Sequence, residues 1–101
     1  MKQFVQFFFV LLLTTGSLAQ VNLNLGLQAY YPFDGNANDI SGNNNNPVFN
    51  NASLTNDRFG NANRAYHFNG TNTYMQVTNS ASLNSVSTLS ISAWVRPTGF
   101  Y

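Results

Sequence analysis

The stretch from Ala29 to Gly42, AYYPFDGNANDISG, constrains the fold of this chain more than any other. It begins as an aromatic segment, breaks at Asp34-Gly35 and continues as a polar turn that carries two of the three carboxylates in the chain. A half-buried strand that ends in Asx and Gly turn residues is typical of β structure. The stretch therefore predicts a β fold with long, asparagine-rich connections.

The scarcity of charge supports this prediction. Only 7% of the 101 residues are charged, against roughly a quarter in an ordinary soluble domain. Glu is absent, and Asn, which favours turns and caps over helix interiors, supplies most of the polar surface. A helical domain would need the helix-forming surface residues that this chain lacks, so we expect an all-β protein.

The amino terminus has the pattern of a secretory signal peptide. Lys2 precedes an apolar run over residues 4–13, and Ser17 and Ala19 are the small residues that a signal peptidase requires. The run is too short for a membrane anchor, because a spanning helix needs about 20 apolar residues. We therefore predict a signal peptide over residues 1–19, a secreted or cell-surface protein that begins at Gln20, and no membrane insertion after cleavage.

Cleavage would leave residues 20–101 without net charge. The three positive charges of Arg58, Arg64 and Arg96 then balance the three negative charges of Asp34, Asp39 and Asp57. This balance argues against nucleic acid or an anionic membrane as a partner. The chain has no Cys, so the fold of an exported protein must rest on a core or a bound ion rather than on disulfides.

Hydrophobic alternation predicts strands at both ends of residues 20–101. Residues 21–27 alternate apolar and polar side chains, and residues 27–33 continue this pattern up to Pro32, which confines the segment to a sheet edge or ends its pairing. The clearest strand is Thr88–Val95, where every second residue is apolar.

The middle of the chain is predicted to be richer in loops. Residues 34–64 show no sustained period. Residues 64–68 and 74–77 are apolar runs around Asn69-Gly70, which favours a hairpin between them. Residues 79–86 fit a loop with one helical turn. Four or five strands without a helix predict an all-β sandwich or barrel.

Several segments together resemble a known family. The stretch YPFDGNANDISG, the later AYHFNG and YMQV, and LSISAWVRP at residues 89–97 are similar, in order and spacing, to LamG-type concanavalin A-like lectin/glucanase domains. The resemblance covers about Leu27 to Tyr101. It implies an antiparallel two-sheet jelly-roll sandwich, of which residues 20–101 would be the amino-terminal part.

This family contains carbohydrate-binding modules, adhesion domains and glycosidases, so the resemblance leaves function open. The first hypothesis is a secreted, non-catalytic module that binds a glycan or a cell-surface ligand. One alternative is an accessory or incomplete domain of a glycoside hydrolase whose catalytic residues lie beyond this chain, and another is a structural spacer of a surface protein.

The carboxylates indicate turn capping or calcium rather than catalysis. A glycosidase needs two carboxylates across the scissile bond, whereas Glu is absent here and the Asp residues lie in polar turns. Asp34 and Asp39 could supply oxygens to Ca²⁺, although capping through Asx hydrogen bonds is the commoner role. The resemblance implies that many family members hold Ca²⁺, with ligands that lie largely beyond the strand matching residues 89–95. We predict no catalytic residue, and we name Asp34 and Asp39 as the candidate metal ligands.

Aromatic rings and amides would be the means of sugar binding. Tyr30, Tyr74 and Trp94 are the candidate residues, because an exposed ring can stack on a sugar while Asn side chains bind hydroxyls. For Trp94 the sequence favours burial between two layers of a sandwich. His67 is the only histidine in the chain and is predicted to be structural.

Overall fold

A computed structural model describes residues 20–84 and 87–99, so the predicted signal peptide over residues 1–19 lies outside the described residues. The described part is all-β, as predicted, and contains no helix. No described segment could therefore cross a membrane as an apolar helix. Its four short strands are β1 (Pro47–Asn50), β2 (Ser53–Thr55), β3 (Ala65–His67) and β4 (Met75–Val77).

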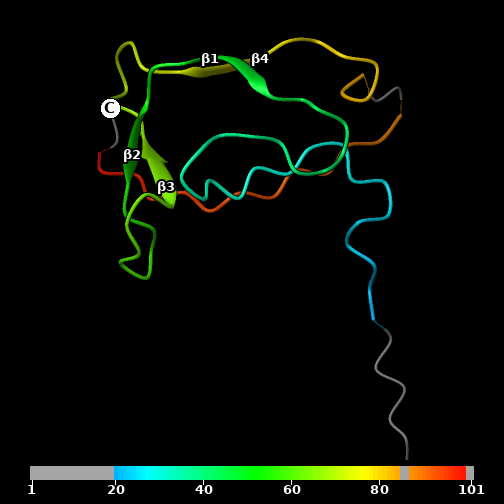
Figure 1. Cartoon of the computed structure of the whole chain (residues 1–101), viewed down its shortest axis with the longest axis horizontal. Coiled ribbons are helices and arrows are strands. Elements are labelled where there is room, and N and C mark those ends of the chain that lie inside the picture. The colour runs from blue at the N-terminus through cyan, green and yellow to red at the C-terminus, as the bar shows by residue number, and fades with distance from the viewer. Residues whose placement is uncertain (1–19, 85–86, 100–101) are drawn as a thin grey trace, which may run out of the picture.

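The strands form two antiparallel pairs, one nested inside the other along the chain. β2 and β3 pair in register from Ser53 opposite His67 to Thr55 opposite Ala65. β1 pairs with β4, with Asn50 opposite Met75, and the register shifts between Pro47 and Phe49. Figure 1 shows that the two pairs run in different directions. Together they make one long hairpin that is interrupted on both of its arms.

Asn51 joins the two pairs at this interruption. Its backbone N–H donates to the carbonyl oxygen of Tyr74 at 3.4 Å, and its side-chain Oδ1 accepts the Tyr74 N–H at 2.8 Å. Its Nδ2 donates to the carbonyl of Asn72 at 3.1 Å. A side-chain amide thus provides the hydrogen bonds of one more backbone step, while residues 68–73 loop out between β3 and β4.

The hairpin predicted between residues 64–68 and 74–77 is therefore wrong in its pairing. Both segments contain a strand, β3 and β4, but each pairs with an earlier strand instead of with the other. The Asn69-Gly70 turn does form, with Gly70 at a φ of +73°. Its loop is too long to be a two-residue hairpin turn, and residues 47–55, predicted to be loop, provide both partner strands.

The strands predicted over residues 21–27 and 27–33 are also not observed. In the first segment the N–H groups of Leu25 and Leu27 each donate to the carbonyl oxygen three residues earlier, at 3.2 Å. These two bonds make consecutive turns. In the second, the Tyr30 N–H donates to the Asp39 carboxylate, and Phe33 takes a left-handed φ of +57°. Local side-chain capping here replaces the hydrogen bonds of a strand ladder.

Residues 79–84 form a single turn, as predicted for this loop. The N–H groups of Leu83 and Asn84 both bond to the Ser80 carbonyl, at 3.1 and 3.2 Å. The rest of the predicted loop, residues 85–86, lies outside the described residues.

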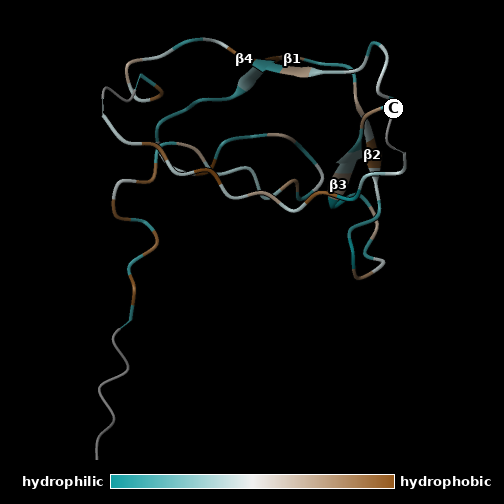
Figure 2. Ribbon diagram, turned by 180° about the vertical axis from the view of Figure 1, so that it is seen from behind, coloured by the Kyte–Doolittle hydropathy of each residue, from teal (hydrophilic) through white to brown (hydrophobic). Residues whose placement is uncertain are grey.

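The segment Thr88–Val95, which has the clearest strand pattern in the sequence, is not part of any strand of the described chain. Leu89, Ile91 and Val95 are 70%, 83% and 82% exposed, and Figure 2 shows hydrophobic stretches along this segment. Alternation creates an apolar face, but a strand forms only where another strand lies at ladder distance. Burying such a side chain is worth about 1.5–3 kcal/mol, which this arrangement does not gain.

The most buried side chains of the described chain are polar. Asp39 is 8% exposed and Asn45 is 4% exposed, and no apolar residue among those described is as deeply buried. The described chain is thus organised by hydrogen bonds around these two residues rather than by an apolar core.

Candidate functional site

A broad, open concavity brings together segments that lie far apart in the sequence. Its walls are residues 23–33, 64–70 and 88–99, with smaller contributions from residues 55–59 and 81–84. Tyr30 and Trp94, which lie 64 positions apart in the sequence, both line it, whereas Tyr74 does not. The structure therefore brings two of the three predicted sugar-binding residues to one place.

Trp94 is exposed and carries a cation on its ring. Its side chain is 83% exposed, so the expectation that it packs between two layers is not met, because no described strand covers it. The Arg58 guanidinium lies 3.9 Å from the centre of the indole and 4.5 Å from the centre of the Phe59 ring. Cation–π attraction of this kind is worth about 0.5–1 kcal/mol at an exposed site.

Tyr30 presents its ring from a fixed backbone. Its N–H donates to Asp39 Oδ1 at 2.9 Å, and its carbonyl accepts the Ile40 N–H at 2.9 Å. The side chain itself is 49% exposed. A ring that is half in water on a backbone held at both polar groups is suited to stacking, because little order has to be gained on binding.

Tyr74 belongs to a different surface, at the edge of the β1–β4 pair. Its ring stacks on Phe49 of β1 with centroids 4.6 Å apart and planes inclined by 25°. Both rings are partly exposed, Tyr74 by 49% and Phe49 by 41%. The two bonds to Asn51 fix the Tyr74 backbone, so this pair is a second aromatic surface, separate from the concavity.

Asp39 caps the loop that precedes β1. Its Oδ1 accepts the N–H groups of Tyr30 and Ser41 at 2.9 and 2.8 Å, and its Oδ2 accepts the Asn45 N–H and the Ser41 hydroxyl, both at 2.9 Å. Burial acts to raise the pKa of Asp39, but these four hydrogen bonds hold it below its ordinary value. The prediction of turn capping is confirmed for Asp39.

Asp34 has a different environment. Its Oδ1 lies 3.4 Å from Arg64 Nε in an ion pair whose two side chains are both more than half exposed, and such pairs contribute little to stability. The carboxylates of Asp34 and Asp39 contact different residues. No group of three or more His, Cys, Asp or Glu residues suited to a metal occurs among residues 20–84 and 87–99. Calcium at these two residues stays a prediction.

Asn45 forms the second half of the polar centre. Its Nδ2 donates to the Gln28 carbonyl and to Ser82 Oγ, each at 2.8 Å. Its Oδ1 accepts the hydroxyl of Ser80 at 2.6 Å and that of Ser82 at 3.2 Å. The residue therefore ties the turn at residues 80–84 to the segment that carries Tyr30, across more than 35 positions of sequence.

Sequence analysis missed Arg58, Asn45 and the two serines as structural contacts. Asn45 lies in a run of four asparagines, and no pattern in the sequence distinguishes it from its neighbours. Arg58 is part of a polar loop, and although Phe59 follows it in the sequence, its contact with Trp94 is revealed only by the fold. His67 lies in β3 opposite Ser53 and lines the concavity, exposed to solvent.

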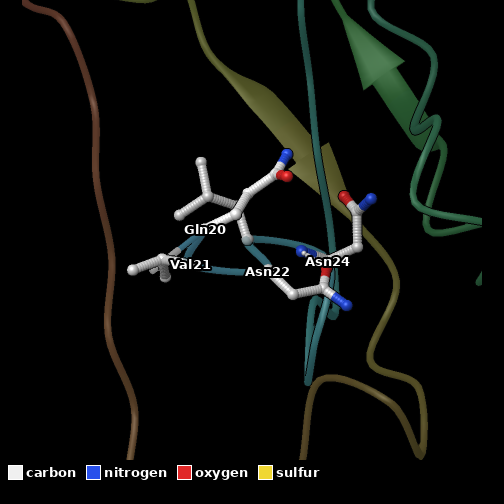
Figure 3. Close-up of a pocket in the computed structure, with 5 residues that line it drawn as sticks. Gln20, Val21, Asn22 and Asn24 are labelled. Atoms are coloured by element: carbon white, nitrogen blue, oxygen red, sulfur yellow. Dashed lines mark hydrogen bonds between the residues drawn. The ribbon is translucent and has the colours of Figure 1, made fainter. Parts of the chain in front are cut away.

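A second, smaller hollow lies at the start of the described chain. Five consecutive residues line it, 20–24, and Figure 3 shows the labelled side chains of Gln20, Val21, Asn22 and Asn24 pointing in different directions. Asn22 Oδ1 accepts the Asn24 N–H at 3.0 Å, so this hollow is the inside of a local turn. It brings no distant residues together and is not a candidate site.

Comparison of the chain with protein-family models, with curated proteins and with solved structures gave no match. Function is therefore argued from the geometry of the concavity and from the chemistry of the residues around it.

Proposed function

We propose that this protein is a secreted, non-catalytic module of LamG type that binds a carbohydrate or a cell-surface glycan. The observation that carries the proposal is that Tyr30 and Trp94 line one open concavity while both rings remain accessible. An aromatic ring that is accessible on one side of a groove can stack on the apolar face of a sugar. The predicted jelly-roll sandwich is part of the same proposal and is supported by the all-β character of the chain.

The polar groups around the concavity complement the two rings. Arg58, Arg64 and His67 lie on its wall, and their N–H groups can donate to sugar hydroxyls or to a uronic acid carboxylate. Arg58 already lies against the Trp94 ring, which leaves the other side of the indole for a ligand. A few polar groups among aromatic side chains are the usual composition of a small-molecule site.

Binding should be measured with the full chain against a panel of soluble polysaccharides that includes neutral β-glucan, xylan and a uronic-acid polymer. If the concavity is the site, Trp94→Ala and Tyr30→Ala each weaken binding by about tenfold or more, since a central aromatic anchor is worth at least about 1.4 kcal/mol. Trp94→Phe should retain part of the affinity, because it keeps a ring.

Tyr74→Ala is the matched control, since Tyr74 is an equally exposed tyrosine outside the concavity. Unchanged affinity in this variant supports the concavity as the site. Loss of binding in Tyr74→Ala alone would transfer the site to the Phe49–Tyr74 surface. If no polysaccharide binds the unmodified chain, the carbohydrate proposal is wrong.

A further inference from the structure

The loop between β3 and β4 is built around one side-chain oxygen. Asn69 Oδ1 accepts the backbone N–H groups of Thr71, Asn72 and Thr73 at 3.0, 3.1 and 3.1 Å, and also the Thr73 hydroxyl at 3.0 Å. An amide oxygen has two lone pairs, so four donors within hydrogen-bond distance are an unusual concentration. The carbonyl of this side chain is therefore strongly polarised.

The residue after Asn69 is a glycine with an unobstructed backbone. Gly70 has a φ of +73°, and apart from its two chain neighbours no described residue has an atom within 4 Å of the position that a Cβ would occupy. Its N–H makes no hydrogen bond with any residue of the described ranges, and the residue is exposed. Asn69-Gly70 is also the one Asn-Gly pair in the whole sequence.

We propose that Asn69-Gly70 is a site of spontaneous covalent modification, at which the loop itself promotes deamidation of Asn69. The Gly70 nitrogen attacks the Asn69 side-chain carbon, loses its proton to solvent and forms a five-membered succinimide, while Nδ2 leaves as ammonia. Water then opens either carbonyl of the ring, which gives aspartate or isoaspartate at position 69. No oxidant, reductant or enzyme is required.

The four donors act on the atom where charge develops. When the Gly70 nitrogen adds to the side-chain carbon, Oδ1 becomes an oxyanion, and backbone N–H groups that already point at it stabilise that state without reorganisation. Glycine adds no side chain that would hinder the attack. Solvent at this exposed loop supplies the water for the second step.

The products differ in their effect on the surface around Tyr74. Asn69 Nδ2 donates to Asn72 Oδ1 at 2.7 Å, and the Asn72 carbonyl accepts from Asn51, which in turn holds the Tyr74 N–H. Aspartate keeps an oxygen for the three backbone donors but loses the bond to Asn72. Isoaspartate adds one carbon to the backbone, so the donors can no longer converge on one atom and the Asn51–Tyr74 contact is released.

The rate of modification should be measured by incubating the purified full chain at neutral to mildly alkaline pH and quantifying aspartate and isoaspartate at position 69 by peptide mapping. A synthetic peptide with the sequence of residues 65–75 is the reference, because it has the same Asn-Gly pair without the fixed loop. We expect the folded chain to convert Asn69 faster than the peptide, because only the folded loop holds the four donors around Oδ1.

Thr73→Val tests the role of the Thr73 hydroxyl, which donates to Asn69 Oδ1 at 3.0 Å and accepts the Asn69 backbone N–H at 2.7 Å, since valine has the shape of threonine but lacks this group. Loss of this hydroxyl should slow conversion in the folded chain by roughly tenfold, which corresponds to one net hydrogen bond, and the same change in the peptide should have no effect. Conversion in the folded chain that is no faster than in the peptide would overturn the proposal, as would an unchanged rate in Thr73→Val. The comparison of chain and peptide decides the matter even if that variant fails to fold.

Discussion

Asp39 Oδ2 accepts the backbone N–H of Asn45 at 2.9 Å, and these two residues are the most buried of the described chain. A carboxylate and a carboxamide thus occupy the place that apolar side chains take in most small domains. Buried polar groups are tolerated only when they are hydrogen-bonded, and no buried side-chain N or O atom among the described residues lacks a partner. Asp39 and Asn45 therefore determine how the segment that carries Tyr30 is held.

Asp39→Ala should destabilise this centre strongly. The change leaves three backbone N–H groups without their acceptor, of which that of Asn45 is buried and the other two are partly buried, and an unsatisfied buried donor costs about 1–3 kcal/mol. The prediction is checked by chemical denaturation and by amide hydrogen exchange, which should accelerate at Tyr30, Ser41 and Asn45. Asp57→Ala is the control, because Asp57 caps its loop in a similar way but is less buried than Asp39 and makes exposed hydrogen bonds, so its effect should stay local and small.

Acid should open the same centre. The folded pKa of Asp39 lies below its ordinary value of 3.8, so its contribution to stability is complete above that value and is lost as the pH falls through the depressed folded pKa. We expect unfolding or loop opening only below about pH 3.8. The transition can be measured by NMR from the amide signals of Tyr30 and Asn45 as the pH is lowered. Asp39→Asn removes the titration, and a midpoint that does not change in this variant would show that another group is responsible.

Arg58 should control the environment of Trp94, which is the single tryptophan and hence a specific fluorescent probe. Arg58→Ala removes the guanidinium that lies 3.9 Å from the ring centre, so quenching of the Trp94 fluorescence by acrylamide should increase. Arg58→Lys keeps the charge and should show an intermediate effect. The stability change should be about 0.5–1 kcal/mol. Identical quenching in all three proteins would contradict the contact.

Catalysis by the carboxylates of this chain is not expected. Asp39 uses both oxygens for four hydrogen bonds, and Asp34 is paired with Arg64, so no two free carboxylates face each other as hydrolysis of a glycosidic bond requires. The purified chain should release no reducing sugar from β-glucan or other polysaccharides between acidic and alkaline pH. Release that disappears in Asp34→Asn would show that this loop is catalytic.

Export is tested at the amino terminus of the mature protein. The small residues Ser17 and Ala19 predict cleavage that leaves Gln20 first, with or without cyclisation to pyroglutamate. Mass spectrometry of the protein recovered from the medium of its expression host should give this terminus. Protein in the medium that still begins at Met1 would refute the prediction of a cleaved signal peptide.

The sequence by itself determined the class of structure and the places where it turns. The lack of helix-forming surface residues excluded helices, and Asn-Gly and Asp-Gly pairs marked turns at residues 34–35 and 69–70, both of which have a glycine at positive φ. These features are local, because a glycine or an Asx residue changes the backbone within a few positions. The strands around residues 65–67 and 75–77 were found for the same reason.

Pairing and burial were decided only by the tertiary structure. Hydrophobic alternation in residues 27–33 and 88–95 predicted strands that do not form, since the Tyr30 N–H bonds to Asp39 instead and the segment after Thr88 joins no sheet. Alternation specifies a face, whereas a ladder needs a neighbour that only the path of the chain can supply. Asn45 is buried while its neighbours are not, and Tyr30 and Trp94 share one concavity that excludes Tyr74. Both facts depend on contacts between residues far apart in the sequence, which no local pattern records.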